Sequence, residues 1–92
     1  MSSEHAEEGS VVVTKVGQSS ESSLQHLGYW VRGSLAKAPK INEPLVVARE
    51  ERNGVKAPGL FTTSLILNIV YLSSWRYLIQ TENSTWMVEE LS

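Results

Sequence analysis

The chain has 92 residues, a formal net charge of −2 and no cysteine. This length suits one small domain. The lack of cysteine excludes a disulfide framework, a thiolate metal site and a cysteine nucleophile, and it fits a cytoplasmic protein. Three of the ten acidic residues lie in the first ten positions, so the rest of the chain is close to neutral. A near-neutral domain has no overall field to attract nucleic acid or an anionic membrane, and such binding would need a local patch.

The N-terminal segment, residues 1–10, is rich in glutamate and serine and poor in apolar side chains. This composition favours a disordered acidic tail and lacks the basic and apolar regions of a secretory signal. The most apolar run, residues 65–72, is much shorter than the roughly 20 residues of a membrane-spanning helix. We therefore expect an acidic tail followed by one domain over residues 11–92, with no membrane partner.

Three strands are predicted in the first half of that domain. β-Branched residues favour a strand over 11–16, which ends at Gly17 and leads into a polar loop over residues 18–23. From residue 27 to 35 side chains alternate with the period of a half-buried strand, which places Trp30 and Arg32 together on the more polar side. After a connection over residues 36–43, an apolar third strand begins near Pro44 and becomes charged over residues 49–52.

Asn53-Gly54 follows the third strand. A type I′ turn needs positive φ at both central residues, and Asn-Gly is the dipeptide that adopts it most readily. The sequence therefore predicts a two-residue hairpin at this point, with the chain returning through Val55 and Lys56.

Residues 60–72 contain much of the chain's apolar content and alternate as a long fourth strand. The alternation predicts that Leu65, Leu67 and Ile69 point into the core, while Ile66 and Val70 are covered more lightly. If Ile66 and Val70 were exposed, they would form an apolar patch of the kind that marks an interface.

Residues 64–80 also fit a helical period, with Ser64 as an N-cap. The Thr, Ile and Val content and the Ser73-Ser74 pair favour the strand, and the helix stays open as the alternative. A last hairpin is expected to join residues 75–80 to residues 85–88 through a turn at Glu82 and Asn83. Its alternating large side chains are expected in the core and in cross-strand pairs: Trp75, Tyr77, Trp86 and Met87.

Five or six short strands without a convincing helix predict an all-β fold, a small five- to six-stranded barrel of the SH3-like or translation-barrel type. Closure is favoured because it removes exposed strand edges.

Several short motifs have the character of turns and strand ends: Gly28-Tyr29, Gly33, Leu35, Pro44-Leu45, Asn53-Gly54, Phe61-x-Thr63-Ser64, Ile69 and Thr81-x-Asn83-Ser84. Together they resemble short bacterial and phage-associated β-barrel proteins of unassigned function, over about residues 27–88. The spacing of Gly28, Gly33 and Pro44 is also remotely similar to the β-barrel second domain of translation GTPases. Neither resemblance implies catalytic residues.

The sequence contains no recognisable catalytic or cofactor-binding motif. It has no Gly-x-Ser-x-Gly, no His-Glu-x-x-His and no phosphate-binding glycine-rich loop. Glu50 and Glu51 are adjacent on a predicted strand and therefore point to opposite faces. His26 is better explained as a solvated loop residue than as a general base. We predict a protein that is not an enzyme and that uses no metal or cofactor.

Two features could serve binding. Trp30 beside Arg32 would suit stacking on a base or gripping a peptide, and the alternative is that Trp30 belongs to the core. Basic residues also gather around the third strand, either as a phosphate-contacting edge or as a solvated, charge-protected strand face. The candidate macromolecule-binding residues are Trp30, Arg32, Lys37, Lys40, Arg49, Arg52 and Lys56.

The leading hypothesis is a non-enzymatic barrel that binds another macromolecule, either a different protein or further copies of itself. The alternative is a nucleic-acid-binding barrel in which Trp30 stacks on a base and the basic residues contact phosphates.

Overall fold

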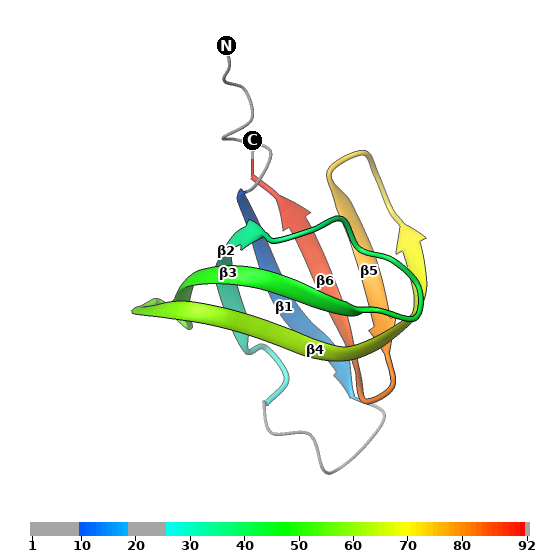
Figure 1. Cartoon of the computed structure of the whole chain (residues 1–92), viewed down its shortest axis with the longest axis horizontal. Helices are drawn as coiled ribbons and strands as arrows, with labels where there is room; N and C mark the ends of the chain where they lie inside the picture. Colours follow the sequence, from blue (N-terminus) through cyan, green and yellow to red (C-terminus); the bar gives the residue numbers. More distant parts are fainter. Residues whose placement is uncertain (1–9, 19–25, 92) are drawn as a thin grey trace.

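The computed structural model describes residues 10–18 and 26–91. In this part of the chain six antiparallel strands form a closed barrel in which each strand pairs with the next and β1 pairs with β6 (Figure 1). The all-β barrel prediction is confirmed, and the helical alternative is wrong because strands occupy most of residues 64–80. The strands are β1 (Ser10–Gln18), β2 (Trp30–Leu35), β3 (Pro44–Arg52), β4 (Val55–Tyr71), β5 (Arg76–Thr81) and β6 (Ser84–Glu90).

Two predicted irregular segments fall mainly outside the described residues. The acidic tail was predicted over residues 1–10, but Ser10 is the first residue of β1 and pairs with Ser34. The polar loop was predicted from residue 18, but Gln18 still belongs to β1. In both cases the strand is longer than its β-branched residues indicate, because pairing with β2 and β6 extends it. Within the described residues no helix is long and apolar enough to span a membrane.

The core fills the interior with alternate side chains from all six strands. Three aromatic rings pack together: the Phe61 and Trp86 centroids are 5.1 Å apart, and the Tyr29 centroid lies 6.3 Å from that of Phe61 and 6.4 Å from that of Trp86. Aromatic pairs with these separations stabilise a core beyond their buried area. The buried apolar residues are Val11, Val13, Val31, Leu45, Val47, Phe61, Ile66, Tyr77, Ile79, Trp86 and Val88.

The predicted orientation of the centre of β4 is wrong. Ile66 is fully buried, whereas Leu65 and Leu67 are exposed. Two bulges explain the difference, because an extra residue reverses which side chains face the core. One lies where β4 passes Pro44 and Val46 of β3, and the other lies after Ile66, at the start of the pairing with β5. Beyond the second bulge the predicted phase returns: Ile69 packs against the core and Val70 is partly exposed.

Two hairpin predictions are confirmed. Asn53 and Gly54 have φ values of 48° and 85°, and they join β3 to β4 as a two-residue turn. Glu82 and Asn83 join β5 to β6.

The large residues predicted for the last hairpin divide between the two faces. Tyr77 and Trp86 are in the core, and Met87 pairs with Leu78 across the strands. Trp75 is exposed, so its predicted place in the core is wrong. Trp75 precedes β5 in the connection after β4, where the alternation of the strand does not apply.

Candidate functional site

The predicted basic residues do not form one patch. Lys37 and Lys40 belong to the connection before β3, while Arg49, Arg52 and Lys56 lie toward the β3–β4 turn at the opposite end of that nine-residue strand (Figure 1). The connection is held to β4, because Asn42 donates its backbone N–H to the Ile66 carbonyl. At roughly 3.3 Å per residue, the length of β3 separates the two groups.

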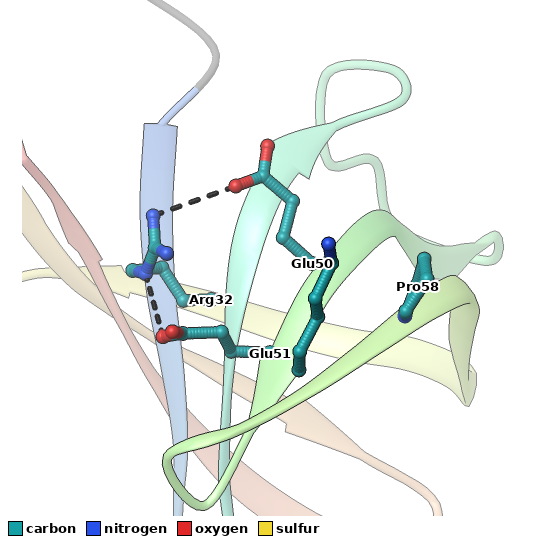
Figure 2. A pocket seen from close by; sticks show the side chains of 5 residues that line it. Arg32, Glu50, Glu51 and Pro58 are labelled. Atoms are coloured by element: carbon teal, nitrogen blue, oxygen red, sulfur yellow. Dashed lines mark hydrogen bonds and ion pairs between the residues drawn. The ribbon is translucent and has the colours of Figure 1, made fainter.

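Arg32 lies on the outer side of the barrel and contacts both Glu50 and Glu51. The prediction that these two glutamates point to opposite faces is therefore wrong, because β3 has an extra residue between Arg49 and Glu51. The Arg32 Nε donates a hydrogen bond of 2.9 Å to Glu51 Oε1, and its Nη1 lies 3.5 Å from Glu50 (Figure 2). The hydrogen bond from Arg32 holds the pKa of Glu51 below its usual value. Arg32 is therefore partly neutralised before any ligand arrives.

These residues surround a shallow hollow of about 290 Å³, lined by Arg32, Glu50, Glu51, Lys56 and Pro58. Figure 2 shows Arg32 joined to both glutamates, with Pro58 on β4. Two cations and two anions line the hollow, so it has no net charge to attract a phosphate group. We call the outward side of these five residues the charged surface.

Trp30 is half-buried on the outer side and packs against the β3–β4 turn. The Asn53 side-chain oxygen accepts a hydrogen bond of 3.0 Å from the Trp30 backbone N–H, and the Trp30 carbonyl accepts one of 2.9 Å from Asn53 N–H. A Cβ atom on Gly54 would lie 4.0 Å from the Trp30 ring. Trp30 is thus not in the core, and its ring lies beside the turn.

Arg49 and Arg52 point to the other side of the hairpin. They pair with Gly33 and Val31, which face the interior, and directly paired residues share a face of the sheet. Arg49 Nε donates a hydrogen bond of 2.6 Å to the Ala57 carbonyl. The structure therefore does not place these two arginines beside Arg32 on one binding face.

A second outer surface follows β4 itself. Beyond the charged surface, between residues 60 and 70, four large aliphatic side chains are exposed, by 68% at Leu60, 41% at Leu65, 55% at Leu67 and 38% at Val70. Residues 57–75 contain no charged side chain. We call Leu60, Leu65, Leu67 and Val70 the apolar surface. Beyond it, Tyr71 at the end of β4 is exposed, as are Leu72 and Trp75 in the β4–β5 connection.

The sequence prediction missed both this surface and a buried lysine. The exposed leucines could not be found from the alternation, because the bulges in β4 depend on pairing with other strands. Lys15 did carry a signal, since it follows Val11 and Val13 with period two. It is buried in the structure, where its Nζ donates to Gln18 Oε1 at 3.0 Å, and burial lowers the pKa of Lys15.

No protein-family model, curated protein or solved structure matches this chain. The resemblance to short bacterial and phage-associated proteins stays a prediction. Among the described residues, no group of three or more histidine, aspartate or glutamate side chains is placed to hold a metal ion.

Proposed function

We propose that this chain is a non-enzymatic barrel that binds another protein chain through the apolar surface of β4. The observation that carries the proposal is the exposure of Leu60, Leu65, Leu67 and Val70 along one strand, within a segment that has no charge. Exposed apolar side chains that gather in this way mark interaction sites, whereas single ones are ordinary.

The energetic argument favours a protein partner. Covering apolar surface contributes about 25 cal/mol per Å², and a protein can supply aliphatic side chains to fill the spaces between the leucines. A nucleic-acid backbone would instead need cations, and residues 57–75 have none.

The test compares binding by the wild-type chain with two variants. In the first, Leu65→Ser and Leu67→Ser together remove the apolar surface at two exposed positions. In the matched control, Arg32→Gln and Lys56→Gln change the charged surface. Capture of protein partners from the native host, read by mass spectrometry, should fail for the first variant and persist for the control, including at high salt.

The opposite pattern would overturn the proposal, as would turnover of a small molecule by the purified chain. The two leucines are exposed, so the serine variant should remain folded. A melting curve confirms this before the capture is interpreted.

The nucleic-acid hypothesis has one supporting observation, because Trp30 and Arg32 do share the outer side of β2. Arg32 is ion-paired, however, and the basic residues are divided between distant places. Titration with single-stranded DNA and RNA at increasing salt separates the two functions. Binding that weakens steeply with salt would support nucleic-acid recognition. Titrations that show no salt-dependent binding would exclude the nucleic-acid hypothesis.

A further inference from the structure

One edge of β4 is unpaired over the first part of the strand. Residues up to Leu65 pair with β3, whereas pairing with β5, on the opposite edge, begins only at Ile66. Within the described residues, no strand pairs with the β5-side edge of β4 before Ile66. Antiparallel strands direct alternate backbone N–H and C=O groups to each edge, so this part of β4 presents a row of backbone groups.

Part of this edge is protected and part of it is open. Pro58 has no N–H, and the chain is irregular between Lys56 and Gly59. Proline, lysine and bulges are the features that commonly block strand addition. From Gly59 to Ser64 there is no proline and no charge, and Leu60 and Thr62 are exposed. The open part of the edge is therefore centred close to Thr62.

We propose that a second copy of this chain occupies the edge, so that β4 of one copy pairs antiparallel with β4 of the other about a two-fold axis near Thr62. This inference rests on the proposed function and names the partner and the geometry. It continues the sheet from one barrel into the next. Leu60 of one copy then lies beside Leu65 of the other, and the apolar surfaces meet on one side of the joined sheet.

The charge pattern selects a second copy over a charged peptide. An acidic or basic peptide would find no opposite charge over residues 57–75. A second β4 brings the same uncharged segment. The nearest charge on the strand is Lys56, which lies before the open part of the edge. Because β5 occupies the same edge from Ile66 onward, the two copies can pair only over residues 59–65, which contain no charged side chain.

The chain has no cysteine, so a single introduced cysteine reports the geometry directly. On a two-fold axis, residue 62 faces its own counterpart with a Cα separation of about 4.5–5.5 Å, which a disulfide can span. We expect Thr62→Cys to form a covalent dimer rapidly under mild oxidation. Asn83→Cys, in the exposed β5–β6 turn, is the matched control and should remain largely monomeric.

A second pair of variants tests the same axis without covalent chemistry. Thr62→Lys places two ammonium groups at the axis and should convert a sedimenting dimer into a monomer while the melting curve stays cooperative. Asn83→Lys adds the same charge in the β5–β6 turn and should leave the dimer intact.

Three results would overturn the inference. These are a wild-type chain that sediments as a monomer at all concentrations, a dimer that Thr62→Lys leaves intact, and cross-linking through Asn83→Cys that equals that through Thr62→Cys. The proposed function has its own readout. The wild-type chain could be a monomer that captures a different protein, and the serine substitutions at Leu65 and Leu67 could abolish that capture. This result would support the proposed function and would exclude only the pairing with a second copy.

Discussion

The charged surface and the apolar surface both lie on the outer side of the barrel and both include residues of β4, yet they differ in how far their side chains are already satisfied. Around Arg32, opposite charges meet within the chain at 2.9 and 3.5 Å. Along Leu60, Leu65 and Leu67, apolar side chains remain exposed to solvent. The first surface needs no partner to complete its interactions, whereas the second can gain free energy only by being covered.

The difference also follows from the position of each surface in the fold. The charged surface lies where β4 pairs with β3 close to the turn, so pairing with β3 brings Glu51 opposite Lys56, and pairing with β2 brings it opposite Arg32. The apolar surface runs through the two bulges, where β4 leaves β3 and joins β5. Both surfaces contain exposed side chains, so exposure alone does not distinguish them. Strand pairing shows which surface already has its charges opposed within the chain.

The largest expected effect tests the reversed orientation at the centre of β4. Ile66→Ala should reduce the free energy of unfolding by roughly 2–5 kcal/mol, because it leaves a cavity at a fully buried position. Leu67→Ala, at the exposed neighbour, should cost less than about 1 kcal/mol. Denaturant unfolding of the two variants measures both. Equal costs would show that Leu67 is covered and does not belong to the apolar surface.

The next effect concerns pH at the end of β4, where Tyr71 and Tyr77 pair with ring centroids 5.3 Å apart. Burial, with smaller contributions from Glu90 and Tyr71, raises the pKa of Tyr77 to about 12. The unfolded chain loses this proton near pH 10, so it binds fewer protons than the folded chain between pH 10 and 12. The stabilising contribution is thus complete below about pH 10 and is lost toward pH 12, by up to about 2–3 kcal/mol.

Tyr77→Phe should remove this alkaline loss, and unfolding of the variant and the wild type at the same series of pH values would show it. Lys15 acts in the opposite sense. Its pKa is lowered by burial, so its contribution to stability rises with pH toward its ordinary value of 10.5. Both proteins contain Lys15, so the difference between their free energies of unfolding at each pH reports the contribution of Tyr77 alone. If the free energy of unfolding falls equally in both proteins above pH 10, Tyr77 is not the titrating group.

A smaller effect is expected at the turn that supports the charged surface. Gly54 has a φ of 85°, a conformation that branched side chains strongly disfavour. Gly54→Val should therefore lower the free energy of unfolding by about 1–2 kcal/mol. Val55→Ala, at the exposed neighbour, is the control and should change the melting temperature little. An unchanged melting temperature for Gly54→Val would contradict the two-residue turn.

The smallest effect belongs to the charged surface itself. Arg32→Gln removes the ion pairs with Glu50 and Glu51, which are accessible to solvent and screened by salt. We expect a small fall in the unfolding midpoint at low salt that disappears at high salt. A large fall that salt does not change would mean that Arg32 supports the barrel through packing, and the contrast between the two surfaces would weaken.

Much of the barrel could be predicted from the sequence, because its determinants are local. A run of β-branched residues at 11–13 and the alternation after residue 27 identify strands wherever they pair. Asn53-Gly54 identifies a hairpin since the turn conformation depends on those two residues. The meander order then follows from short connections between neighbouring strands.

The candidate site depended on the tertiary structure. The two bulges in β4 decide whether Ile66 or Leu67 faces the core. Their positions depend on how β4 pairs with β3 and then with β5, and the local sequence pattern does not contain that information. The basic residues were grouped by their nearness in sequence. An extended strand moves each residue about 3.3 Å further along, so β3 carries Lys40 and Arg52 to opposite ends of the strand. Which side chains are exposed on the outer side of the barrel is therefore determined by strand pairing.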